Sequence, residues 1–273
     1  MTERFRKKSR SGLAKIAVIR LPRISNFTDI APLEAVDELD VSYVSNISQF
    51  GDPDVVIIPG SKNTISDLLW MRQNGLEGKI LRHAAKGGIV FGICGGYQML
   101  GQSISDPTGA EQKGTVRGMG LLPVTTVFEQ EKRRTRVSGR FAKVGGALAE
   151  MSGVCYEGYE IHMGRTVLSK GTVPLVYMEE EGEQRQDGAQ SDHVYGCYMH
   201  GIFDMSETVK TFLAAVLRKK GIDPSKITVR DRNAYKEEQY DRLASIVREN
   251  LNMEAVYKII EKGNEASCSL LSE

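Results

Sequence analysis

Short apolar, β-branched runs alternate with helical stretches through the first hundred residues, and this alternation restricts the fold more than any other feature. Two of the runs, residues 54–58 and 89–93, each lead through turn or glycine residues into apolar residues at helical spacing. Further strands are predicted over residues 15–20 and 41–44, and helices over residues 65–71 and 76–86. Strands that alternate with helices indicate an α/β fold, with an open, mostly parallel sheet and helices on both faces.

Between residues 114 and 199 the pattern changes to short β-type runs with turn signals between them. We expect these runs to form the other half of the same sheet plus an antiparallel extension. Residues 179–192 are polar throughout and indicate an exposed loop or hairpin tip. The predicted strands cover residues 136–144, 156–166, 174–178 and 194–199, and helical spacing returns over residues 206–219, 236–249 and 253–262.

The charge of the chain is concentrated at its start. The formal net charge is +1, whereas residues 1–12 hold five basic residues and one acidic residue. A nearly neutral remainder excludes a general attraction to nucleic acid or to an anionic membrane. We expect a basic tail or linker stub over residues 1–12, one domain over 13–262 and a disordered tail over 263–273.

No apolar segment follows the basic residues, and the sequence contains no run of about 20 apolar residues, so neither a secretory signal nor a spanning helix is predicted. We therefore expect a cytoplasmic protein without a membrane partner. The four cysteines are sparse and irregularly spaced, which argues against a disulfide framework. Cys155 and Cys197 are expected to be core thiols, and Cys268 an exposed thiol.

The segment Gly92–Gln98 (GICGGYQ) lies where a predicted buried strand meets a predicted helix. A residue on such an elbow projects from the sheet and faces the start of the helix, whose dipole stabilises a thiolate. Cys94 is therefore the candidate nucleophile, and the N–H of Gly95 is a candidate oxyanion donor. The alternative is that Cys94 is an ordinary buried thiol.

A thiol nucleophile needs a base, and the position of each histidine in the predicted fold separates the candidates. His83 lies within a charged helix and is expected on the surface. His200 directly follows a predicted strand, so it should share with Cys94 the edge where open α/β sheets place their ligands. A zinc site at Cys197, His200 and His193 is disfavoured because alternate strand residues face opposite ways, and no metal is expected.

The turn at residues 59–64 (PGSKNT) also follows a strand and opens a helix, so its N–H groups face the same edge. The P-loop spacing GxxxxGK[ST] is absent from the sequence, which argues against phosphate binding. The backbone near Gly60 and Ser61 could instead supply the second oxyanion donor. A helix-capping turn, with Asn63 or Thr64 as N-cap, is the alternative.

These segments together resemble the class I glutamine amidotransferases, and within that class the glutaminase domain of the cobyric acid synthase type. The resemblance rests on GICGGYQ, on VIIPGSKNT (56–64) and on YMHGIF (198–203). It is supported by LPRISNFTDIAPL (21–33), YEGYEIHMG (156–164) and YDRLASIVR (240–248), and it covers about residues 13–250.

The resemblance implies a flavodoxin-like fold and a glutaminase activity. Cys94 would attack the side-chain amide of L-glutamine, and His200 would transfer the protons. Gln98 would contact the bound glutamine, while the backbone near Gly60, Ser61 and Gly95 would hold the oxyanion. The domain itself would need no cofactor.

The ammonia would pass to a synthetase domain or subunit that uses ATP and Mg²⁺. That partner would bind the corrinoid adenosylcobyrinic acid a,c-diamide and amidate it to cobyric acid, on the route to cobalamin. Alternatives are a glutaminase subunit of another synthetase, such as one that amidates lipid II or makes cobyrinic acid a,c-diamide, and a non-catalytic binding module that keeps the elbow.

Two departures from the family pattern limit the inference. Triad members of the class carry a glutamate two residues after the histidine, whereas this chain has Ile202 there. The sequence therefore predicts a dyad of Cys94 and His200, with Glu160 as a guess for the residue that orients the imidazole. The ATP-binding half expected before residue 13 is also missing, so this chain would be either the C-terminal part of a longer protein or a separate subunit.

Overall fold

The structure is a computed structural model, and it describes residues 12–180, 183–226 and 232–269. The chain divides into two compact units, residues 1–229 and residues 230–273, and each is described by itself. Within its described residues the first unit contains two six-stranded sheets. The second unit contains the helices α6 (Arg232–Asn250) and α7 (Met253–Ser269).

The first sheet has the strand order β11-β12-β4-β3-β1-β2, and only the β11–β12 pair is antiparallel. Its strands are β1 (Ala14–Ile19), β2 (Leu39–Val44), β3 (Val55–Ile58), β4 (Ile89–Ile93), β11 (Ala189–Ser191) and β12 (Val194–Cys197). Its five parallel strands follow the flavodoxin-like order, in which ligands bind beyond the carboxyl ends of the strands. Every residue of β3 and β4 is buried, as expected for central strands covered on both faces. The predicted α/β fold is confirmed.

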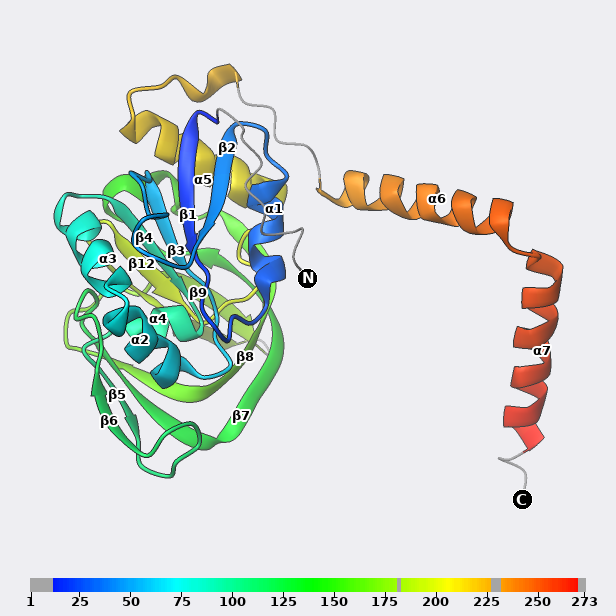
Figure 1. Cartoon of the computed structure of the whole chain (residues 1–273), viewed down its shortest axis with the longest axis horizontal. Helices are drawn as coiled ribbons and strands as arrows, with labels where there is room; N and C mark the ends of the chain where they lie inside the picture. The colour runs from blue at the N-terminus through cyan, green and yellow to red at the C-terminus, as the bar shows by residue number, and fades with distance from the viewer. Residues whose placement is uncertain (1–11, 181–182, 227–231, 270–273) are drawn as a thin grey trace. The chain divides into compact units, whose positions relative to one another are not determined.

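Helices cover both faces of this sheet (Figure 1). The short helix α1 (Ala31–Glu34) packs beside α5 (Ser206–Lys219) on one side, and α2 (Thr64–Gln73) packs beside α3 (Leu76–Ala85) on the other. Helix α4 (Gly95–Leu100) follows β4 directly, and a 3₁₀ turn, η1 (Phe27–Ile30), precedes α1. The remaining 3₁₀ turns are η2 (Gly146–Met151) and η3 (Pro224–Lys226).

The second sheet corrects one expectation about the middle of the chain. Only β11 and β12 join the first sheet, whereas the other strands form a separate, mainly antiparallel sheet. Its strands are β5 (Ser103–Asp106), β6 (Gly114–Arg117), β7 (Val124–Phe141), β8 (Cys155–Leu168), β9 (Val176–Glu180) and β10 (Glu183–Asp187). β7 and β8 are long enough to pair over two stretches with a register shift between them, and the short apolar runs do not reveal this.

Two predicted irregular segments are more ordered than expected. Residues 179–192 contain the end of β9, the whole of β10 and β11, and the buried Asp187, so this segment is a hairpin with a buried carboxylate and not an exposed loop. Residues 263–269 belong to α7, where the sequence predicted disorder, while residues 1–11 and 270–273 of the two predicted tails lie outside the described residues. Among the described helices, none combines the length and the apolar character needed to span a bilayer.

Candidate active site

Cys94 lies on the predicted elbow between β4 and α4. Its backbone has φ 52° and ψ −110°, which is strained for a non-glycine residue and turns the chain sharply from strand to helix. The turn also depends on Gly96, because a Cβ there would lie 2.0 Å from the carbonyl oxygen of Ile58. Only glycine lets α4 approach the end of β3 this closely.

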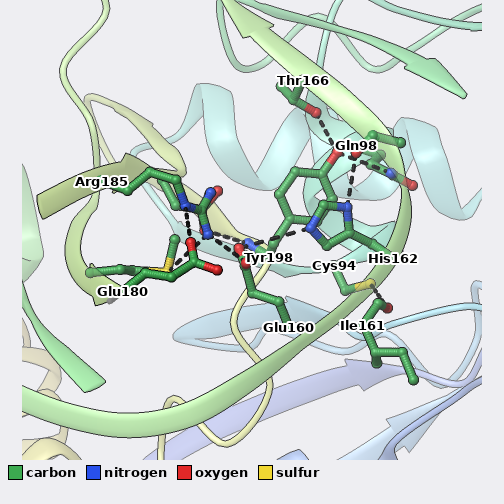
Figure 2. Close-up of polar contacts among 12 residues, drawn as sticks. Cys94, Gln98, Glu160, Ile161, His162, Thr166, Glu180, Arg185 and Tyr198 are labelled. Atoms are coloured by element: carbon green, nitrogen blue, oxygen red, sulfur yellow. Dashed lines mark hydrogen bonds and ion pairs between the residues drawn. The ribbon is translucent and has the colours of Figure 1, made fainter. Parts of the chain in front are cut away.

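The thiol of Cys94 is nearly enclosed, with 6% of the residue exposed. Its Sγ donates to the carbonyl oxygen of Ile161 in β8 at 3.7 Å, and its N–H donates to the carbonyl oxygen of Cys197 at 2.8 Å. Figure 2 shows Sγ directed at this carbonyl. The nucleophile candidate thus lies where the first sheet meets a strand of the second.

His200 follows β12 and is fully buried at the same edge of the sheet. Its backbone pairs with that of Tyr159 in β8 through two hydrogen bonds of 2.9 and 3.1 Å, and the Tyr159 ring stacks on the imidazole at 5.2 Å between centroids. The side chain of Cys94 lies close enough to the imidazole to raise its pKa. The two residues that the sequence singled out therefore meet in the fold.

A third residue, Asp29 in η1, orients the imidazole. Its Oδ2 lies 2.7 Å from Nδ1 of His200, and its Oδ1 accepts the N–H of Gly201 at 3.0 Å. The carboxylate is buried, so the contact is shielded from water. Nε2 of His200 lies 2.9 Å from Nδ2 of Asn26, whose left-handed backbone (φ 48°) begins the same turn.

The surroundings of His200 favour its charged form. Burial by itself lowers the pKa of the imidazole, but the hydrogen bond to Asp29, the nearby side chain of Cys94 and the charges of these two groups outweigh burial and raise the pKa to about 10. A thiol beside an imidazole that a buried carboxylate orients is an arrangement suited to nucleophilic catalysis.

Asp29 and Asn26 were missed by the sequence reasoning. Both lie in the segment 21–33, which was noted only for its likeness to a family. The expected position for an acid was two residues after His200, and Ile202 there is buried. The sequence analysis suggested Glu160 as the residue that orients the imidazole. Glu160 contacts Arg185 and His162 instead, so this prediction is wrong. Asp29 is the one acidic residue in this segment, but its neighbours include the polar Ser25, Asn26 and Thr28, so no local pattern marked it as buried.

The turn at residues 59–64 faces the elbow. A Cβ on Gly95 would lie 3.0 Å from the backbone nitrogen of Ser61, and one on Gly60 would lie 3.1 Å from Cε1 of His200. The N–H of Gly95 is also the first of α4, where a helix leaves its donors without an intrahelical partner. The backbone of Ser61 thus lies close to Gly95 at the start of α4.

The same turn also caps α2, so the helix-capping role that the sequence offered as an alternative is present as well. Asn63 is the N-cap, and its Oδ1 accepts the N–H of Ser66 at 2.9 Å. The hydroxyl of Ser61 donates to Asp67 at 2.6 Å and accepts the N–H of Asn63 at 2.9 Å. The side chain of Ser61 therefore stabilises the turn, and its backbone is what the site can use.

Gln98 is buried on α4 with both ends of its amide bound by protein groups. Its Oε1 accepts from Thr64 at 3.2 Å, and its Nε2 donates to the hydroxyl of Tyr198 at 3.1 Å. That hydroxyl also lies 2.6 Å from the hydroxyl of Thr166 (Figure 2). The role predicted for Gln98, contact with a bound glutamine, stays a prediction.

The remaining candidates lie apart from this site. His83 is half-buried, and its Nε2 lies 3.1 Å from the carbonyl oxygen of Ile89 at the opposite end of β4. Cys197 is a core thiol, as predicted, whereas Cys155 is exposed, contrary to expectation; the side chain of Cys268 lies outside the described residues. Where side chains are described, no three His, Cys, Asp or Glu residues form a group that could hold a metal ion.

Comparison with known proteins places this geometry in a family. The family described as "CobB/CobQ-like glutamine amidotransferase domain" matches residues 15–208. The chain is 52% identical over 269 residues to a cobyric acid synthase of Ruminiclostridium cellulolyticum, covering 97% of this chain and 52% of that protein. It is 43% identical to the cobyric acid synthase of Lachnoclostridium phytofermentans, covering 96% of this chain and 53% of that protein.

Solved structures agree at the level of the fold. A chain of PurLQS from Thermotoga maritima matches with a TM-score of 0.56 and 17% identity, over 76% of this chain and 99% of its own length. A crystal structure titled as a glutamine amidotransferase matches with a TM-score of 0.53 and 14% identity, over 74% of this chain and 98% of its own length. The chain spans about half the length of the curated relatives it matches.

Proposed function

Because the chain belongs to the family of CobB/CobQ-like glutamine amidotransferase domains, we propose that Cys94 hydrolyses L-glutamine through a thioester and that the ammonia feeds an ATP-dependent synthetase. The observation that carries the proposal is the catalytic arrangement. Cys94 lies on a strained elbow with its side chain near the imidazole of His200, and His200 contacts the buried carboxylate of Asp29 at 2.7 Å.

In the first half-reaction, Nε2 of His200 holds the proton of the Cys94 thiol, in keeping with the raised pKa of the imidazole. The thiolate attacks the side-chain carbonyl carbon of glutamine, and the carbonyl oxygen becomes an oxyanion. When this intermediate collapses, the carbon–nitrogen bond breaks and His200 returns the proton to the leaving nitrogen. The products are free ammonia and a γ-glutamyl thioester on Cys94.

The oxyanion needs donors that are already oriented. The backbone nitrogen of Ser61 lies close to Gly95 at the elbow, and we propose that the N–H groups of these two residues bind the oxyanion together. The glycine at position 60 leaves room beside the imidazole, because a Cβ there would come within 3.1 Å of it. We assign Gly60, Ser61 and Gly95 to the oxyanion site and Gln98 to the pocket for glutamine.

In the second half-reaction, water attacks the thioester and His200 takes a proton from that water. The tetrahedral intermediate then releases the thiol of Cys94, which receives the proton, and glutamate leaves. Asp29 accepts a hydrogen bond from Nδ1 of His200, so that Nε2 is the nitrogen that exchanges protons. No cofactor is needed in this domain for either half-reaction.

The proposed acceptor of the ammonia is a synthetase half or subunit that holds ATP and Mg²⁺. Relatives at 43–52% identity are named cobyric acid synthase and are about twice as long as this chain, which supports a partner of that type. Its substrate would be adenosylcobyrinic acid a,c-diamide and its product cobyric acid. The location proposed is the cytoplasm, where ATP is available to the partner.

The test is a glutamine hydrolysis assay on the 273-residue chain, alone and with a cobyric acid synthase synthetase half plus ATP. We expect hydrolysis that Cys94→Ala abolishes, and covalent labelling of Cys94 by 6-diazo-5-oxo-L-norleucine. Hydrolysis of glutamine by the Cys94→Ala protein at the wild-type rate would contradict the mechanism. A Cys94 that is not labelled with or without the partner would identify a binding module instead.

A further inference from the structure

A partly exposed ionic cluster with a buried carboxylate at its centre lies beside the catalytic residues and takes no part in the mechanism above. Its centre is the carboxylate of Glu160 in β8, which is fully buried. Nη2 of Arg185, from β10, donates to Oε2 of Glu160 at 2.5 Å, and Nε2 of His162 lies 3.8 Å from Oε1. Nε of Arg185 also lies 3.3 Å from Glu180 (Figure 2).

The cluster stabilises the charged form of the Glu160 carboxylate, although burial disfavours that form. Burial raises the pKa of Glu160, but the nearby imidazole of His162, the hydrogen bond from Arg185 and the charge of Arg185 outweigh burial and lower the pKa to about 2. Glu160 is therefore ionised and pairs with a cation supplied by another strand. Removing one partner of such a pair leaves an uncompensated buried charge, which a structure relieves by moving or by taking up a proton.

The neighbours of Glu160 in the chain are the residues that contact the catalytic pair. Tyr159 forms both backbone hydrogen bonds to His200 and stacks on its imidazole, and the carbonyl of Ile161 accepts from the thiol of Cys94. Successive side chains of a strand point to opposite faces, so Glu160 holds the strand from the face opposite Tyr159 and Ile161. The position of the strand thus depends on what Glu160 binds.

We propose that Arg185 is a positioning residue for the catalytic pair, acting through Glu160 on the β8 segment that carries Tyr159 and Ile161. This inference rests on the proposed function, because it assigns Arg185 to the geometry of that same site. Arg185 touches neither Cys94 nor the proposed oxyanion donors, so its effect has to pass through the strand. The β9–β10 hairpin thereby contributes a residue to the site that its polar sequence alone does not reveal.

The structure suggests how large the effect should be. A displacement of about 1 Å in a catalytic group can cost about 100-fold in rate. We therefore expect Arg185→Met, which removes the charge and keeps the length, to lower kcat about 10- to 100-fold, while KM for glutamine changes less than about threefold. Arg185→Lys should restore kcat to within about fivefold of the wild type, because a cation again reaches Glu160.

A matched control is available on the same pair of strands. Arg165 in β8 forms an ion pair with Glu129 in β7 at 3.0 Å, but both side chains are exposed and neither contacts the catalytic pair. Arg165→Met should leave kcat within about twofold, since exposed ion pairs contribute little. A loss in Arg165→Met equal to that in Arg185→Met would overturn the proposal.

A double-mutant cycle with Glu160→Gln tests the route of the effect. Because both groups act through one contact, Arg185→Met/Glu160→Gln should be no slower than the worse single variant within about twofold. Losses that multiply in the double variant would contradict this route. An Arg185→Met protein with kcat within twofold of the wild type would overturn the proposal outright.

Two control measurements separate a loss of folding, and a failure of the proposed function, from a failure of the positioning role of Arg185. Thermal unfolding of each variant, followed by circular dichroism, shows that rates are measured on folded protein. If Arg185→Met does not fold, Glu160→Gln replaces it with the same expected loss in kcat. If the wild-type chain hydrolyses no glutamine with or without the synthetase half, the proposed function fails, whatever the variants do.

Discussion

Replacing Asp29 by asparagine tests the catalytic arrangement most directly. The Asp29 carboxylate accepts from Nδ1 of His200 at 2.7 Å and from the N–H of Gly201 at 3.0 Å. An asparagine has one acceptor and one donor at these positions. If its oxygen keeps the bond to Gly201, its NH₂ faces Nδ1 and forces the imidazole proton onto Nε2. That is the nitrogen that must take the proton from Cys94.

The expected loss is large. The corresponding Asp→Asn change in a serine protease triad lowers kcat about 10⁴-fold for the same tautomer reason, so we expect a fall of about 10²- to 10⁴-fold in Asp29→Asn. The rise in the pKa of His200 from 6.5 to about 10 corresponds to about 5 kcal/mol. Asp29 and Cys94 both contribute to this rise in the pKa of His200. We therefore expect Asp29→Asn to lose about half of the corresponding free energy, roughly 2 to 3 kcal/mol of unfolding free energy.

The sign of the pH dependence follows from the raised pKa. A group whose pKa is higher in the folded state contributes its full stability below its unfolded value of 6.5 and loses it as the pH rises through about 10. The stability difference between the wild type and Asp29→Asn should therefore be greatest near pH 6 and shrink toward pH 10. Urea unfolding at several pH values measures this difference.

Asp54→Asn is the matched control. Asp54 also bonds a backbone N–H, that of Lys15 at 2.8 Å, and pairs with Lys220 at 2.7 Å, but it precedes β3 and therefore lies at the other end of the strands from the site. The kcat of the Asp54→Asn protein should stay within about twofold of the wild type. An Asp29→Asn protein with kcat within threefold of the wild type would refute the role given to Asp29.

Three further predictions concern the rest of the first unit. Gly96→Ala should lose about 2 to 3 kcal/mol in urea unfolding because its Cβ would lie 2.0 Å from a carbonyl oxygen, whereas Gly78→Ala in α3, with open space around it, should gain up to about 1 kcal/mol. Burial and the charge of the neighbouring Glu160 carboxylate raise the pKa of Asp187 from 3.8 to about 6. Below pH 4 the protonated carboxyl group therefore adds about 3 kcal/mol to the free energy of unfolding. This contribution is lost as the pH rises through 6. Asp187→Asn should remove that dependence, and an unchanged difference between pH 4 and 7 would contradict it. In native protein a thiol reagent should modify the exposed Cys155 rapidly and the buried Cys197 only after unfolding, as mass spectrometry of the labelled peptides would show.

The central sheet and its functional edge could be predicted from the sequence because their signals are local. A short β-branched run that ends in glycines and opens a helix is recognisable within about ten residues, and Gly92–Gln98 has this form. The rule that ligands bind at the carboxyl ends of parallel strands then brought Cys94 and His200 together. In the structure both residues lie at this edge, and the side chain of Cys94 is near enough to the imidazole of His200 to raise its pKa.

The second sheet was not predictable in the same way. Several of its strands pair with the next strand in the chain, but β7 and β8 extend over 18 and 14 residues and pair with each other along most of that length. Strand pairing of this kind depends on neighbouring strands more than on intrinsic propensity. The polar hairpin of β9 and β10 gives the clearest case, because its composition predicts exposure while the fold buries Asp187 and joins Arg185 to Glu160.

The sequence by itself determined the strand-to-helix elbow, the nucleophile on it and the histidine at the same edge, because each depends on residues that are neighbours in the chain. Only the tertiary structure decided which acid orients that histidine. Asp29 and His200 are 171 residues apart in the sequence, and they meet because β1 and β12 lie in one parallel sheet and both lead to its carboxyl edge. No local pattern marks a contact of that kind, since it arises from the order of the strands.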